Sequence, residues 1–133
     1  MANYKVTTVG LPIRESRFTF VGQTSMTSAD VGKAAALALG SEANTVKLAG
    51  DGDIPLGRIE TVEVEMNGDV SVSVLLLGGF RLNCAVGEKF QAGDTIVGSA
   101  TAGLVKSGGV SKDFRFFVSE PDTTEGFVGV IKL

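Results

Sequence analysis

Hydrophobic and polar residues alternate along two neighbouring stretches in the middle of the chain, on either side of Asn67-Gly68. Glutamates alternate with the apolar residues of the first stretch and serines with those of the second; the apolar positions are Ile59, Val62, Val64, Met66, Val70, Val72 and Val74. A period of two residues is typical of a β-strand with one buried face. Because Asn-Gly between two such runs is a strong hairpin signal, the pattern predicts two antiparallel strands joined by a tight turn.

The register of this hairpin follows from keeping the apolar residues on one face. A loop of Asn67-Gly68 alone would place Val64 opposite Ser71 and mix the two faces. A three-residue loop over 67–69 pairs apolar residues with one another, namely Met66 with Val70, Val64 with Val72 and Val62 with Val74. A slip of one residue turns every side chain to the opposite face, so we predict the three-residue loop or a bulge rather than the two-residue turn.

Short apolar stretches separated by glycine-rich breaks recur roughly every ten residues through the second half of the chain, a spacing typical of all-β folds. They predict further strands over 80–84, 95–99, 104–106, 114–118 and 127–133. Together with the 18 glycines of the chain, this spacing indicates an all-β fold, either a compact β-sandwich or a small β-barrel of short strands.

The segment 30–39 allows two interpretations. Its three consecutive alanines favour a helix, and Asp30 could cap it, but Gly32 and Gly40 leave room for only one or two turns. The alternative is a short strand over 34–39 that turns through 40–44 into a second strand over 45–48. We favour the strand pair.

Residues 1–33 differ from the rest of the chain in charge and in pattern. They hold four basic and two acidic residues, whereas the remainder is net acidic. Apart from Phe18 and Phe20, they lack periodic apolar residues. We therefore expect an extended N-terminal arm over residues 1–20, followed by a single β domain over residues 21–133.

The composition excludes several kinds of catalytic site. The chain contains no histidine, no tryptophan and a single cysteine. A Ser–His–Asp triad, a Cys–His pair, a zinc site of Cys and His ligands and an intrachain disulfide therefore cannot form within it. We expect a protein that is not an enzyme, with no catalytic residues, no metal ligands and no cofactor.

Charge and hydropathy narrow the range of partners. A net charge of −3 opposes binding to nucleic acid, because contacts to phosphates need clustered cations. The densest apolar run, 70–80, is far shorter than a membrane span, and the first residues lack the apolar core of a secretory signal. We expect no nucleic acid, no membrane contact and synthesis in the cytoplasm.

Two acidic motifs have a functional interpretation and a plainer one. The carboxylates of Gly50-Asp51-Gly52-Asp53 could bind calcium, but the further ligands of a calcium loop are missing, so a turn is favoured. Glu63 and Glu65 could form an acid–base pair, but they lie on a strand whose other face is apolar, so we expect them in solvent.

Cys84 and the aromatic segment 114–117 also allow two interpretations each. Cys84 has apolar neighbours and is expected as a buried hydrophobe rather than a reactive thiol. The segment 114–117 combines aromatic residues with Arg115, as in proteins that stack on single-stranded nucleic acid. Because the chain is acidic, we favour packing of Phe114 and Phe116 in the core, with Phe117 at an interface.

Several short Gly- and Asp-based motifs of the chain resemble a known family. They are the "LAGDGD" turn over 48–53, the strand 56–63, the "VGEKFQAGD" segment over 86–94 and the "GLVK" strand over 103–106. In this arrangement the region 30–109 resembles the capsid cement, or head decoration, proteins of tailed bacteriophages. The resemblance implies a non-enzymatic, β-rich structural protein of the virion that binds the outer surface of an assembled capsid and stabilises it by bridging neighbouring subunits.

The resemblance also implies a set of partners and a location. The partner would be the major capsid protein, on the outer capsid surface, with the protein made in the host cytoplasm. Decoration proteins commonly bind as small oligomers, so we expect a homo-trimer, with a dimer as the second choice. The arm and the C-terminal strand are the expected contact elements, through Tyr4, Lys5, Arg14, Arg17, Phe18, Phe117, Phe127, Val128 and Val130.

An alternative of a different class stays open. The chain could be a soluble carbohydrate- or ligand-binding module, or a virion module that adheres to the host. Such a module would present exposed aromatic residues on one face. Tyr4 and Phe117 are the candidates in this sequence.

Overall fold

The computed structural model describes residues 16–39, 42–110 and 115–133. These residues form an all-β fold with a single turn of 3-10 helix over Ser28–Asp30. No helix in the described ranges is long and apolar enough to cross a membrane. The strands are β1 Arg17–Gly22, β2 Ala34–Leu37, β3 Thr45–Leu48, β4 Gly57–Val64, β5 Val70–Leu75, β6 Gly78–Asn83, β7 Asp94–Gly98, β8 Val105–Val110, β9 Phe116–Glu120 and β10 Phe127–Lys132.

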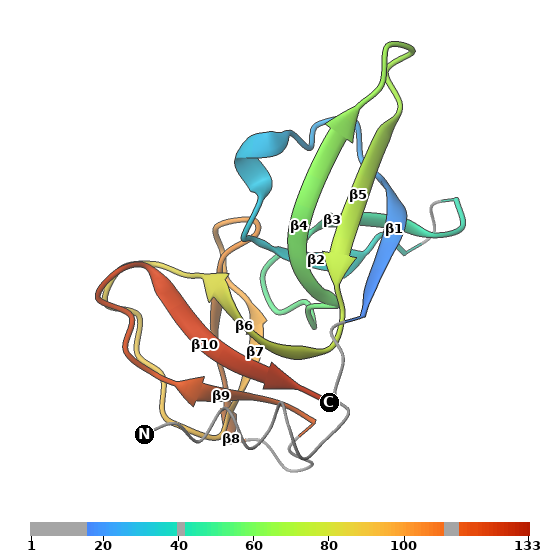
Figure 1. Ribbon diagram of the computed structural model, residues 1–133. Coiled ribbons are helices and arrows are strands. Elements are labelled where there is room, and N and C mark those ends of the chain that lie inside the picture. The colour runs from blue at the N-terminus through green and yellow to red at the C-terminus, as the bar shows by residue number, and fades with distance from the viewer. Residues whose placement is uncertain (1–15, 40–41, 111–114) are drawn as a thin grey trace.

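The first five strands form a small closed barrel in the order β1-β3-β2-β4-β5, which the pairing of β5 with β1 completes (Figure 1). Only β1 and β3 run parallel; the other neighbours in the barrel are antiparallel. Closure gives every strand two hydrogen-bonded neighbours, so the barrel has no free edge.

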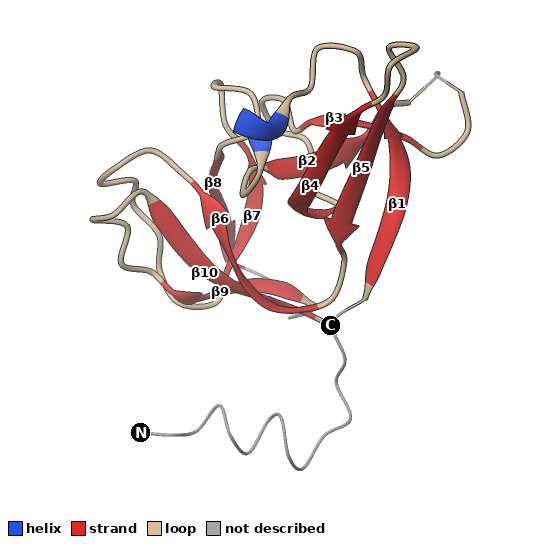
Figure 2. Ribbon diagram, turned by 45° about the horizontal axis from the view of Figure 1, so that its top comes forward, coloured by secondary structure: helices blue, strands red, loops and turns tan. Residues whose placement is uncertain are grey.

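The last five strands form a second layer beside the barrel (Figure 2). Strand β10 lies in the middle of a three-stranded sheet, between β6 and β9. Strands β7 and β8 form a separate antiparallel pair, and β7 lies beside β9. The C-terminal segment is therefore a central strand, with hydrogen-bonding partners on both sides.

Each layer has its own hydrophobic core, and β2 lies between the two. Ala35 packs in the barrel core with Val46, Ile59, Val70, Val72 and Val74. Its neighbours Ala34 and Ala36 pack in the second core, among residues that include Leu82, Ile96, Val105, Val118, Val128 and Val130. Successive side chains of a strand point to opposite faces, so the side chains of β2 enter the two cores in turn. A strand that packs between two cores needs small residues at its buried positions.

This placement explains the alanine run. The predicted pair of strands is confirmed, since β2 runs antiparallel to β3 with Ala35 opposite Leu48. Alanine prefers helices by a fraction of a kcal/mol per residue, and the burial of both faces of β2 outweighs that preference.

The hairpin of β4 and β5 keeps the predicted faces but not the predicted partners. Val64 pairs with Val70 and Val62 with Val72, so apolar residues do face one another. The loop is 66–68, one residue earlier than expected, because Gly68 has a φ of 91° and takes the last loop position. Left-handed backbone at that position is typical of a three-residue loop with a bulge. The predicted pairing of Met66 with Val70 is therefore wrong.

The later strands agree with the prediction within a few residues at their ends. The segment 17–20, assigned to the arm by its charge, instead pairs along β5 as part of β1, with Phe18 opposite Val74 and Phe20 opposite Val72. Residues 1–15 of the expected arm lie outside the described residues.

Candidate functional site

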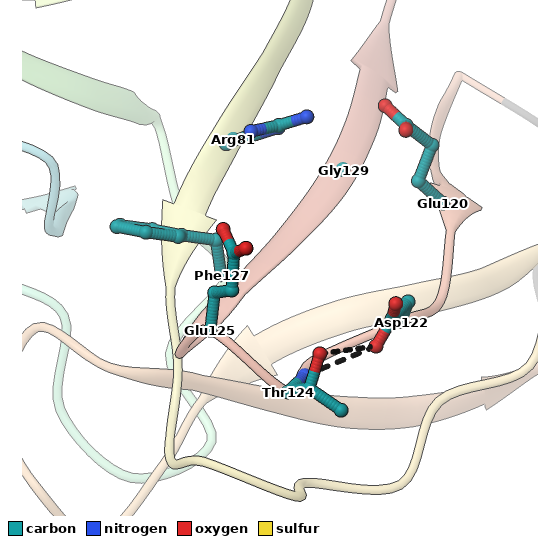
Figure 3. A pocket seen from close by; sticks show the side chains of 7 residues that line it. All are labelled: Arg81, Glu120, Asp122, Thr124, Glu125, Phe127 and Gly129. Carbon is teal, nitrogen blue, oxygen red and sulfur yellow. Dashed lines mark hydrogen bonds between the residues drawn. The ribbon is translucent and has the colours of Figure 1, made fainter.

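A surface hollow of about 180 Å³ lies on the outer face of the three-stranded sheet (Figure 3). The strands β6, β9 and β10 provide its floor and one side, and the connection between β9 and β10 provides the other side. The residues that line it are Arg81, Glu120, Asp122, Thr124, Glu125, Phe127 and Gly129.

The floor of the hollow depends on the register around Gly129. This glycine pairs with Arg81 of β6 on one side and with Glu120 of β9 on the other. A Cβ atom at Gly129 would lie 2.6 Å from the Cβ of Glu120, so the space above this residue is taken by the glutamate side chain. Arg81 and Glu120 therefore flank the middle strand at a position that has no side chain of its own (Figure 3).

The wall of the hollow is fixed by hydrogen bonds within the β9–β10 connection. The carboxylate of Asp122 accepts the backbone N–H of Thr124 at 3.1 Å and its hydroxyl at 2.9 Å. The buried hydroxyl of Thr123 donates to the carbonyl oxygen of Glu88 at 2.7 Å. Hydrogen bonds thus fix the shape of the β9–β10 connection and attach it to the loop after β6.

The hollow is acidic with one apolar side. It contains the carboxylates of Glu120, Asp122 and Glu125 against the guanidinium of Arg81, which makes no salt bridge within the described ranges. Phe127, at its margin, is 40% exposed. Such a site can accept hydrogen bonds and can contact an apolar surface.

Asp122 is a poor candidate for a general acid. A carboxyl group that works as a general acid needs a raised pKa. The backbone N–H of Thr124, and then its hydroxyl, lower the pKa of Asp122. This carboxylate therefore stays ionised and acts as a hydrogen-bond acceptor.

The predicted contact residues fall into separate groups. Arg17 and Phe18 are exposed on β1 of the barrel. Phe127 borders the hollow. Phe117 is partly buried on β9, where it pairs with Ile131 of β10. Because side chains alternate along β10, Ile131 is on the same face of the sheet as Phe127. The two phenylalanines thus lie on the same face of the three-stranded sheet, whereas the β1 residues belong to the barrel.

Five of the predicted contact residues are not on the described surface. The side chains of Val128 and Val130 are buried in the core of the second layer, because the odd-numbered residues of β10 face outward. Tyr4, Lys5 and Arg14 lie outside the described residues.

Sequence reasoning missed most of the hollow. Arg81 and Glu120 flank Gly129 only because β10 pairs with both β9 and the distant strand β6. The segment 120–125 did carry a local signal, because it combines three acidic residues with the turn-forming residues Pro121, Thr123 and Thr124.

The Gly50-Asp51-Gly52-Asp53 motif forms a turn. Asp53 accepts the backbone N–H of Gly50 at 2.9 Å and pairs with Lys47 at 3.0 Å, and both partners lower its pKa, the backbone N–H more strongly. Asp51 pairs with Lys106 of β8 at 2.6 Å. Each carboxylate is thus neutralised by a lysine, so the motif acts as a structural turn that joins β3 to the second layer.

The structure also places the other candidates that the sequence offered. Glu63 and Glu65 are exposed on the hairpin of β4 and β5. Cys84 is 5% exposed, and its burial, followed by the nearby charge of Glu88, raises the pKa of its thiol to about 11. Phe116 packs against the second core, as predicted, whereas Phe114 lies outside the described residues.

Comparison with known proteins gives one informative result. No protein-family model and no curated protein matches the chain. A solved structure described as the capsid of Myoviridae Phage XM1 contains a chain with a similar fold, with a TM-score of 0.57 and 16% sequence identity. The similarity covers 92% of this chain and 84% of that chain. At this identity, the comparison establishes a shared fold.

Proposed function

We propose that this protein is a virion protein that decorates an assembled phage capsid. It binds the outer surface of the shell and bridges neighbouring major capsid subunits. The observation that carries the proposal is the fold shared with a chain of a phage capsid structure, over 92% of this chain. The resemblance of residues 30–109 to head decoration proteins, which rests on sequence motifs, supports it independently.

The physical basis of such a role is preferential binding. A protein that binds the assembled shell better than the free subunits stabilises the shell by mass action. A homo-trimer, or as second choice a homo-dimer, would add avidity, since each copy holds the others near their sites. No catalysis is required, and the lowered pKa of Asp122 fits a binding surface.

The proposal is tested with purified protein and undecorated heads of its own phage. Analytical ultracentrifugation of the protein alone measures its oligomeric state, and co-sedimentation with the heads measures binding. We expect a small oligomer that sediments with the heads and raises the temperature at which they release DNA. Protein that stays in the supernatant at all head concentrations would exclude decoration.

The proposed contact elements are tested separately. Removal of residues 2–16 deletes Tyr4, Lys5 and Arg14 and leaves every strand of the barrel intact. If the arm contacts the capsid, the truncated protein binds heads at least about tenfold more weakly, as expected for the loss of several contacts. Equal affinity of the truncated and full-length proteins removes the arm from the contact surface.

One observation favours a second function, a carbohydrate- or ligand-binding module of the virion. The hollow beside Phe127 combines an exposed aromatic ring with fixed carboxylates and a guanidinium, groups that can stack on a sugar and accept hydrogen bonds from its hydroxyls. Screening on a glycan array tests it: signal for the intact protein that disappears in Phe127→Ser supports this function, and the absence of any signal rejects it.

A further inference from the structure

The hairpin of β4 and β5 ends in an exposed apolar surface that is not among the contact elements proposed above. Its end, residues 64–69, is called here the hairpin tip. Figure 1 shows the tip extending beyond the other elements of the barrel. Val62 is still packed against the barrel core, whereas Val64 is 60% exposed and Met66 is fully exposed. The apolar pattern of β4 thus continues past the end of the barrel into solvent.

Hydrogen bonds hold the tip in a defined shape. The backbone N–H of Glu65 donates to the carbonyl of Asp69 at 2.7 Å, and Gly68 N–H donates back to the carbonyl of Glu65 at 2.9 Å. Two further hydrogen bonds of 3.0 Å join Asn67 and Asp69: the side-chain amide of Asn67 donates to the carboxylate of Asp69, and its Oδ1 accepts the backbone N–H of Asp69. Because its shape is set before binding, the tip loses little conformational entropy when it docks.

The tip is also uniformly acidic around its apolar residues. Glu65 and Asp69 in the tip, and Glu63 just before it, are exposed, and none of them forms a salt bridge within the described part of the chain. The sequence contains no lysine or arginine between Arg58 and Arg81. The complementary partner surface is therefore an apolar depression with a basic border.

From these observations we infer that the hairpin tip is a docking element that inserts Met66 and Val64 into an apolar crevice of a partner protein, bordered by lysine or arginine side chains. The inference rests on the proposed function, in which the partner is the assembled capsid. The unbranched methionine side chain suits this role because it adapts to irregular apolar surfaces. The carboxylates of the tip then pair with the basic border of the crevice.

The apolar contact is tested with Met66→Ser, and Val86→Ser is the matched control because Val86 is a similarly exposed apolar residue far from the hairpin, between β6 and β7. We expect Met66→Ser to weaken binding to heads by about tenfold or more, with an unchanged melting temperature, since the side chain makes no packing contact that folding needs. Val86→Ser should bind like the unmodified protein. Equal affinity of both variants overturns the inference.

The charge contribution is tested with Glu65→Gln against Glu42→Gln, which removes an exposed carboxylate elsewhere. Glu65→Gln should bind heads more weakly and with a smaller dependence on salt concentration, because one ion pair is lost. Identical salt dependence of the two variants contradicts the basic border.

The outcomes separate this inference from the proposed function. If the unmodified protein binds heads and the tip variants bind equally well, decoration stands and the docking element is wrong. If the unmodified protein does not bind heads, both fail. If Met66→Ser changes the oligomeric state of the protein alone, the tip contacts a second copy of the chain, which also overturns a capsid contact.

Discussion

Gly98 lets strand β7 approach the turn after β3 without an intervening side chain. An added Cβ atom would overlap the carbonyl oxygen of Gly50. The same approach allows two backbone hydrogen bonds, from Gly52 to Gly98 at 2.9 Å and from Gly98 to Asp53 at 2.8 Å. A single glycine thus joins the second layer to the loop that leads back into the barrel.

Substitution of this glycine should be costly. Gly98→Ala must displace backbone atoms and break these hydrogen bonds, so we expect a loss of about 2–3 kcal/mol in the free energy of unfolding. Gly79→Ala is the control, since its Cβ would lie 3.9 Å from the nearest atom. Urea denaturation of both variants measures the difference; equal midpoints would show that the contact is dispensable.

Lys132 connects the same two layers at the end of the chain. Its ammonium group donates to the carbonyl oxygen of Leu56, the residue just before β4 of the barrel. It also lies 5.6 Å from the centre of the Phe116 ring. Burial lowers the pKa of Lys132 from its usual 10.5. The charged form is therefore less favourable in the folded protein than in the unfolded chain.

This shift has a definite pH dependence. Between the lowered pKa of the folded protein and 10.5, the unfolded chain binds more protons, so stability increases as the pH rises through that window. We expect the free energy of unfolding to increase there relative to Lys132→Met, which has no titrating group. Urea denaturation of both proteins at several alkaline pH values gives the comparison, and parallel pH profiles would contradict the shift.

At the scale of the elements, β2 is the strand whose side chains are most constrained. Ala34 and Ala35 are completely buried and point into different cores. Ala35→Leu would add three heavy atoms inside the closed barrel, and Ala34→Leu would add them to the second core. We expect each to lower the free energy of unfolding by about 1–3 kcal/mol in urea denaturation. If either is neutral, the corresponding core contains unfilled space.

The elements also show how far the sequence predicted the structure. Alternation predicted the faces of β4 and β5, because burial fixes which side of a strand is apolar. It did not predict the loop position, because counting apolar pairs ignores the backbone conformation that Gly68 adopts. The pattern did not predict strand β1. Phe18 and Phe20 have the two-residue spacing of a strand, but the basic charge of the segment favours an extended arm.

The candidate site was less predictable than the fold. The sequence did predict Phe127, at the margin of the hollow, as a contact residue, because Phe127 begins an apolar strand. Arg81, Glu120 and Asp122 could not be predicted, because the hollow forms only when β10 pairs with β6, a strand that is distant from it in sequence. The hairpin tip, in contrast, lies within one continuous segment and is visible in the sequence once the register is known.

At the scale of the whole molecule, the shared strand makes the two layers interdependent. Unfolding the barrel would remove β2, which also covers the second core. We therefore expect a single cooperative thermal transition, in which the calorimetric and van't Hoff enthalpies agree. Two resolved transitions in calorimetry would show that the layers are separate folding units.

The buried cysteine has a practical consequence for labelling experiments on the protein. With a pKa of about 11, only roughly one Cys84 thiol in ten thousand is ionised at pH 7, and the side chain is almost completely covered. Native protein should leave a thiol reagent such as Ellman's unreacted, and unfolded protein should consume one equivalent per chain. A cysteine introduced at an exposed position would then be the only thiol to take a fluorophore, so the protein could be labelled at a chosen site without removing the natural residue.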